Sequence, residues 1–133
     1  MKSNFQFLFE KNRLETFNTW VYSDKQQCSA RKMAEAGFIF VGSRIEPDLA
    51  KCFFCNKELD GWEKDDDPWK EHLSHSSHCQ FAIRNTPEDE MTVYQFLDIA
   101  NAYGEKIIED YHNNKLTLLE KAFKTAEEYF LPN

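Results

Sequence analysis

The spacing of apolar and polar residues divides this chain near Pro87. Up to that proline, apolar residues occur in short groups between turn-forming residues, which is typical of short strands and helices. Beyond it, they recur every three to four positions over residues 92–131, the spacing of an amphipathic helix. A continuous helix of that length would extend for about 60 Å. The pattern therefore predicts one domain over residues 1–87 and a helical segment over residues 88–133.

The first part is expected to contain three short strands and three short helices. The strands are expected at residues 38–41, at 51–54 and around 59–62, where apolar residues cluster between turns. A short amphipathic helix is expected to carry Arg13, Leu14, Phe17 and Trp20. A second helix, over 31–36, is expected to begin at a cap on Ser29 and to end at Gly37. A third is expected to begin at Asp67-Pro68, with aspartate as the cap and proline in the first helical position.

Four residues have the spacing of a zinc site: Cys52, Cys55, His72 and Cys79. A C-x2-C pair can direct both sulfur atoms at one point, and a later histidine and cysteine can complete a tetrahedron. Such a Cys3His site is closed to water, so its binding energy of about 10–16 kcal/mol becomes folding energy. The alternative is reduced cysteines that align by chance. The expected fold class is α+β: a small zinc-stabilised three-stranded antiparallel sheet with short helices, followed by one long C-terminal α-helix.

The long helix is expected to begin at a reciprocal cap formed by Thr92 and Gln95, and it has an apolar face. Its members are Phe96, Ala100, Tyr103, Ile107 and Tyr111 and then, after Asn113-Asn114, Leu118, Ala122, Ala126 and Tyr129. Because a helix of this length cannot bury that face against so small a domain, we expect it to meet partner helices in a coiled coil or bundle. The alternatives are a solitary solvated helix and, given the interruption at the two asparagines, a two-helix hairpin.

Composition narrows the possible functions. The 133-residue chain carries 23 acidic residues against 16 Lys and Arg, a net charge of −7, and it has no basic run. Nucleic-acid binding is therefore not expected, whereas a cationic partner such as a histone tail or a free amino terminus fits this charge. No apolar run approaches the ~20 residues that cross a bilayer, and residues 5–9 are too few for a secretory signal. The zinc site would use three of the four cysteines and leave Cys28 unpaired. A disulfide framework is therefore not expected, and a reducing compartment is.

Several motifs together resemble a baculovirus inhibitor-of-apoptosis repeat. Besides the zinc spacing, they are Met33-Ala34-Glu35-Ala36-Gly37-Phe38, Glu46-Pro47-Asp48, Cys52-Phe53-Phe54-Cys55, Leu59-Asp60-Gly61-Trp62 and Asp65-Asp66-Asp67-Pro68-Trp69. One such repeat followed by a long helix, with no RING domain, is similar to the single-repeat members of this family. The resemblance is dense over residues 10–85 and looser in the helix, and it implies one structural Zn²⁺ and a non-enzymatic role. A ubiquitin ligase lacks support, because no cysteine follows Cys79.

A cluster of carboxylates lies beside Trp62 in the sequence. Asp60, Asp65 and Asp66 repel one another, and a free α-ammonium group would relieve this repulsion and receive hydrogen bonds. The simpler interpretation is a set of solvated turn carboxylates. The resemblance implies a groove that binds partners beginning with alanine, with a phosphate held by a histidine where apoptotic members typically have tryptophan. The expected peptide-binding residues are Lys57, Glu58, Leu59, Asp60, Trp62, Asp65, Asp66 and His75.

The resemblance also implies a function: an adaptor of the chromosomal passenger complex. The metal domain would bind the histone tail that begins Ala-Arg-phosphoThr. The helix would bundle with borealin-like and inner-centromere-like proteins and so bring an Aurora-type kinase to centromeres. The implied locations are nucleus and cytoplasm, and in mitosis the centromere and spindle midzone. A homodimer is expected when partners are absent. The alternative is an apoptosis inhibitor that binds caspases or alanine-initiated antagonists. The expected dimer or partner interface is Phe5, Val93, Phe96, Leu97, Ala100, Tyr103, Ile107, Tyr111, Leu118 and Ala122.

Overall fold

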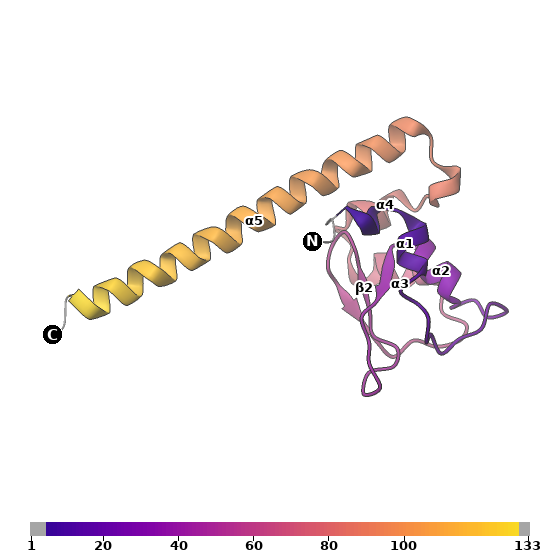
Figure 1. The fold of residues 1–133 in the computed structure, drawn as a ribbon. Coiled ribbons are helices and arrows are strands. Elements are labelled where there is room, and N and C mark those ends of the chain that lie inside the picture. Colours follow the sequence, from indigo (N-terminus) through magenta and orange to yellow (C-terminus); the bar gives the residue numbers. More distant parts are fainter. Residues whose placement is uncertain (1–4, 131–133) are drawn as a thin grey trace. The chain divides into compact units, whose positions relative to one another are not determined.

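A computed structural model describes residues 5–130 of the chain (Figure 1). Contacts between residues divide the chain into two compact units, Met1–Phe96 and Leu97–Asn133. The first unit holds the sheet and the short helices, and the second holds most of one long helix. The segment that follows the expected boundary at residue 87 therefore packs with the first unit as far as Phe96.

The sheet has three antiparallel strands in the order β1-β2-β3: β1 (Phe38–Phe40), β2 (Ala50–Cys52) and β3 (Glu58–Leu59). Each strand is shorter than its predicted range. Strand β2 ends at Cys52, and shortly after it the backbone N–H groups of Phe54 and Cys55 turn back toward the Cys52 sulfur at 3.3 and 3.4 Å. Asn56 then takes a left-handed conformation with φ of 63°. The predicted antiparallel sheet and the predicted fold class are confirmed.

Short helices pack around this sheet: α1 (Glu10–Leu14), α2 (Ala30–Glu35), α3 (Pro68–His75) and α4 (Gln80–Arg84). The two caps expected from sequence are present. The Ser29 side chain accepts a hydrogen bond from the Lys32 N–H, and the Asp67 carboxylate accepts from the N–H groups of the first turn of α3. No sequence pattern predicted α4 or the two 3-10 helices, η1 (Gln6–Leu8) and η2 (Glu88–Glu90).

The first predicted helix is wrong in extent, because α1 ends at Leu14. The Thr16 hydroxyl donates to the Arg13 carbonyl at 2.6 Å, which competes with continuation of the helix. The same hydroxyl accepts from the Phe40 N–H at 2.9 Å and so caps part of β1. Phe17 and Trp20 therefore lie outside the helix, where their rings pack edge-to-face with centroids 5.3 Å apart.

The core of the first unit lies between the sheet, α2 and α4. Phe38, Met33 and His72 are fully buried in it, and so is Arg13, at 1% exposure. Gly37 is required at the end of α2 for two reasons. Its φ is +99°, and a Cβ there would lie 2.8 Å from the Phe81 ring of α4. This close approach brings α4 against the metal site.

Helix α5 (Val93–Phe130) is continuous through Asn113-Asn114, so the hairpin alternative is wrong (Figure 1). Its start is the predicted one: the Thr92 N–H donates to the Gln95 side chain, and the Gln95 N–H donates to the Thr92 hydroxyl. The predicted last residue, Leu131, lies outside the described residues. Between residues 5 and 130, no helix is both long enough and apolar enough to span a bilayer.

Candidate metal centre and peptide groove

The four predicted zinc ligands meet at one point. Cys52 ends β2, Cys55 lies in the following turn, His72 is on α3, and Cys79 immediately precedes α4. Their ligand atoms all lie within 4.8 Å of one another. The Cys52 and Cys79 sulfurs are 4.0 Å apart, and the Cys55 sulfur is 3.7 Å from His72 Nε2. A zinc tetrahedron with Zn–S of about 2.3 Å and Zn–N of about 2.0 Å has edges of roughly 3.5–3.8 Å, so the site fits this ion.

Neighbouring groups orient the ligands. His72 Nδ1 donates to the Ala36 carbonyl at 2.7 Å, which leaves Nε2 directed at the three sulfurs. The Ser76 hydroxyl lies 3.3 Å from the Cys55 sulfur. The Phe38 ring packs against the His72 ring with centroids 4.8 Å apart. These contacts place the imidazole in a dry, fixed position, as a structural metal site requires.

The acid–base state of the thiols also favours a cation. Burial raises the pKa of Cys52 well above its usual range, and the neighbouring thiols add to the increase. Hydrogen bonds from Cys52 and Cys79 hold the pKa of Cys55 far below its usual range. Burial and the close approach of the sulfurs therefore oppose ionisation of all three cysteines in the protein alone. Zn²⁺ supplies the charge that lets all three cysteines ionise, so Cys52, Cys55, His72 and Cys79 hold one structural zinc, as predicted.

The fourth cysteine, Cys28, takes no part in this centre. It is fully buried, with its sulfur 3.8 Å from that of Met33. Burial raises the pKa of the Cys28 thiol to about 12, so it is protonated at neutral pH.

Next to β3 and α3 lies a groove of about 290 Å³. Seven of the eight predicted peptide-binding residues line it, and Asp65 does not. Sequence reasoning missed Gly61 and Glu71. Glu71 stands four residues before His75 on α3, the helical spacing that brings side chains together, and Glu71 Oε2 lies 3.5 Å from His75 Nε2. The groove is lined by Lys57, Glu58, Leu59, Asp60, Gly61, Trp62, Asp66, Glu71 and His75.

The groove wall around Trp62 is held by hydrogen bonds, two of them to residues outside the groove lining. The Trp62 N–H donates to Asp48 at 3.0 Å, and the Tyr22 hydroxyl donates to the Trp62 carbonyl. The indole N–H donates to the Leu59 carbonyl at 3.2 Å. Trp62 is only 5% exposed, and it packs on Phe38, so little of the ring is available to a ligand. Its main role here is to fix the shape of the wall.

The expected interface residues lie at the start of the chain and along α5. Val93 and Leu97 are exposed, Phe5 precedes η1, and Phe96 packs on Phe9 with ring centroids 5.6 Å apart. Ala100, Tyr103, Ile107, Tyr111, Leu118 and Ala122 follow on α5, and the last three are exposed.

Helix α5 carries a second apolar row that sequence reasoning missed. The predicted face contains what we call the first seam: Ile107, Tyr111, Leu118, Ala122 and Tyr129. The second seam consists of Ile108, Leu116, Leu119, Phe123 and Phe130, which are 52–73% exposed. At four places a member of the second seam directly follows a member of the first, so the seams lie about 100° apart around the helix. The same three-to-four spacing, shifted by one residue, was the signal available in the sequence.

The sheet, the closed Cys3His centre and the adjoining groove together define a zinc-stabilised binding module. Residues 13–83 match the Inhibitor of Apoptosis domain, BIR. The chain is 42% identical over 122 residues to Baculoviral IAP repeat-containing protein 5 of Mus musculus, a match that covers 91% of this chain and 87% of the mouse protein. The protein of that name from Rattus norvegicus is 39% identical over 123 residues, or 92% of this chain and 87% of the rat protein.

The chain belongs to the inhibitor-of-apoptosis (BIR) family. Within it, the chain is similar to Baculoviral IAP repeat-containing protein 5, the relative also called survivin, over the repeat and most of the helix. The resemblance to the single-repeat members is therefore confirmed. Proteins of this family are in general not catalytic.

Proposed function

We propose that this protein is a non-enzymatic adaptor of the chromosomal passenger complex that binds the histone tail beginning Ala-Arg-phosphoThr. The observation that carries the proposal is the pairing of charges in one groove. Asp60 and Asp66 offer carboxylates for a free α-ammonium group, while Lys57 and His75 offer donors for a phosphate. A ligand with an amino terminus and a nearby phosphate satisfies both pairs at once.

Asp66 is suited to the amine because its position is already fixed. One carboxylate oxygen of Asp66 accepts from the Glu63 N–H at 2.8 Å, which holds the side chain at the groove. Its other oxygen can accept from a ligand. Asp65, the adjacent carboxylate, does not line the groove and therefore serves as a matched control for Asp66.

The two seams of α5 support the assembly part of the proposal. A single apolar stripe would suit one partner helix, whereas two exposed seams about 100° apart suit two. We assign them to a borealin-like and an inner-centromere-like helix, which would connect the complex to an Aurora-type kinase. Without partners, the apolar residues Phe5, Val93, Phe96 and Leu97 would support a homodimer. The proposed locations are the nucleus and cytoplasm, with the centromere and spindle midzone in mitosis.

The test is to titrate the zinc-loaded full chain with short peptides that begin Ala-Arg-Thr. Acetylating the peptide amine should weaken binding thirtyfold or more, because an unpaired charge left in a partly desolvated site costs about 2–5 kcal/mol. Phosphate on the third residue should strengthen binding, and more so above roughly pH 6, where it carries its second charge. Calorimetry measures both effects.

Matched variants locate the two contacts. Asp66→Asn should weaken binding of every free-amine peptide, whereas Asp65→Asn should not. His75→Ala should remove the gain from phosphate, whereas His78→Ala, at an exposed position outside the groove lining, should keep it. If a peptide beginning Ala-Val-Pro outbinds the phosphorylated tail, the groove instead serves the alternative function, inhibition of cell death.

A further inference from the structure

The segment between α4 and α5 contains a sequence feature that occurs once in the chain. Of the four prolines, Pro47 follows a glutamate, Pro68 an aspartate and Pro132 a leucine. Only Pro87 follows a hydroxyl residue, Thr86. The chain thus holds a single Ser/Thr-Pro dipeptide, and neither the groove nor the metal centre uses it.

The backbone around Thr86 lies between two helices and has no regular secondary structure. Helix α4 ends where Asn85 takes a left-handed conformation, with φ of 48° and ψ of 39°. Pro87 follows in an extended, polyproline-like conformation, with φ of −60° and ψ of 151°. Residues 85–87 belong to no helix or strand, and Thr86 is half-buried, with its hydroxyl donating to the Arg84 carbonyl at 2.8 Å. A kinase could therefore bind this segment in extended form by breaking one local hydrogen bond.

The same segment is tied to α1 by contacts close to Thr86. The Glu88 carboxylate accepts from the Glu10 N–H at the start of α1, at 3.4 Å. Beyond it, Phe96 packs on Phe9. Several carboxylates lie close together at this junction. Burial raises the pKa of Glu10, whereas Arg13 lowers it. The carboxylates of Glu88, Glu35 and Asp89 raise the pKa of Glu10 further. More negative charge here would be poorly tolerated.

We propose that Thr86 is the acceptor of a proline-directed protein kinase, and that its phosphate releases the 86–96 segment from α1. In the transfer, Thr86 Oγ1 forms a bond to the γ-phosphorus of ATP, the bond from that phosphorus to the β-γ bridging oxygen breaks, and ADP leaves. The kinase's base takes the hydroxyl proton. Proline suits the position after the acceptor because it has no N–H and keeps the preceding residue extended.

Release follows from charge. A phosphothreonine carries a charge of about −1.5 to −2 at neutral pH, two residues before Glu88 and three before Asp89. The buried cation of this region, Arg13, already donates to the carbonyls of Phe7, Leu8 and Ala34. Repulsion should therefore break the contact between Glu88 and the Glu10 N–H.

The first experiment incubates the zinc-loaded full chain with a purified cyclin-dependent-type kinase and Mg-ATP, and locates phosphate by fragment mass spectrometry. We expect one phosphorylated residue, Thr86, with no incorporation in Thr86→Val and a rate near background in Pro87→Ala. Asp89→Asn should be phosphorylated at the same rate as the parent chain. Asp89, three residues after Thr86, would be required by an acid-directed kinase but not by a proline-directed one. Zinc content shows that each variant is folded. Phosphate elsewhere, or undiminished transfer to folded Pro87→Ala, would overturn the assignment.

The second experiment tests the consequence by amide hydrogen exchange on the phosphorylated and unphosphorylated chain. The Glu10 amide should exchange faster after phosphorylation, because its acceptor on Glu88 is lost. The Trp62 amide, bonded to Asp48 in the groove wall, is the internal control and should not change. Equal exchange at Glu10 in both forms would refute the release of the segment. It would not change the outcome of the first experiment, which tests the phosphorylation separately.

Discussion

Arg13 is a charged residue at the centre of the first unit. Its Nε donates to Ala34 O at 2.8 Å, and its Nη1 donates to Phe7 O and Leu8 O at 2.9 and 3.0 Å. The guanidinium also lies over the Phe53 ring, 4.8 Å from its centroid. Burial lowers the pKa of Arg13 to about 10, yet the side chain stays charged at neutral pH. One side chain thus ties η1, α1 and α2 together.

Replacing Arg13 with lysine should therefore destabilise the domain, even though lysine keeps the positive charge. An ammonium group cannot reproduce the planar fork, so at least one buried carbonyl loses its donor, and we expect a loss of about 2 kcal/mol or more. Urea unfolding followed by tryptophan fluorescence reports this unit, since Trp20, Trp62 and Trp69 all lie in it. Arg31→Lys, at an exposed position on α2, should leave the midpoint within about 0.5 kcal/mol. Equal midpoints for the two variants would disprove the role given to Arg13.

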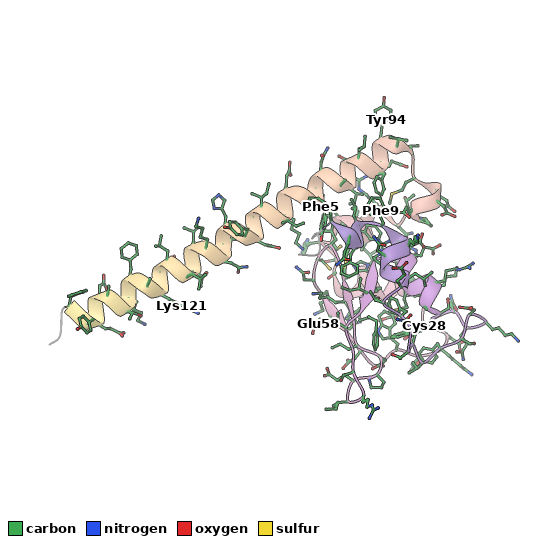
Figure 2. The ribbon with its side chains drawn as sticks, viewed as in Figure 1. Phe5, Phe9, Cys28, Glu58, Tyr94 and Lys121 are labelled. Atoms are coloured by element: carbon green, nitrogen blue, oxygen red, sulfur yellow. The ribbon has the colours of Figure 1, made fainter. Side chains whose placement is uncertain are left out.

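At the scale of elements, α5 differs from the short helices because it carries its own apolar surface. From Ile108 to Phe130 every residue is exposed, and side chains project along the whole length (Figure 2). Eight large apolar residues of this stretch are exposed, from Leu119 at 52% to Tyr129 at 77%. A reciprocal cap at Thr92 and Gln95 starts the helix, but only a partner can remove these side chains from water.

Three consecutive residues allow the two seams to be tested separately. Leu118→Glu places a charge in the first seam and Leu119→Glu places one in the second, whereas Thr117→Glu alters the side outside both. We expect each leucine variant to prevent recovery of the assembled complex from co-expressed partner helices, because each buries a carboxylate in an apolar contact. Thr117→Glu should assemble normally. If Leu119→Glu also assembles normally, the second seam is not an interface.

At the scale of the whole molecule, zinc links elements that are distant in sequence: the end of β2, the start of α4 and the middle of α3. Removing it should unfold the first unit, because about 10–16 kcal/mol of binding energy is folding energy at such sites. We expect Cys52→Ser to lose stoichiometric zinc and native tryptophan fluorescence while circular dichroism still detects helix from α5. Cys28→Ala should retain the metal, since Cys28 is not a ligand. Elemental analysis that finds one zinc per chain in Cys52→Ser would contradict this.

Local features of the fold were predictable because they depend on residues a few positions apart. The caps at Ser29, Asp67 and Thr92 each involve a backbone group within three residues. The C-x2-C pair likewise places two ligands in one turn. Predictions failed where a distant residue decides the outcome. Thr16 helps to end α1 early while its hydroxyl also caps Phe40 on β1.

The sequence by itself determined the zinc ligand set, the fold class and the amphipathic long helix, because ligand spacing and helical periodicity are local patterns. Tertiary structure decided which carboxylates share the groove: Glu71 lines it and Asp65 does not. It also decided that the buried Arg13 holds three segments together, and that Glu88 caps a helix some eighty residues earlier in the chain. These outcomes depend on how α3, η2 and α1 pack, which is set by contacts between residues far apart in the sequence.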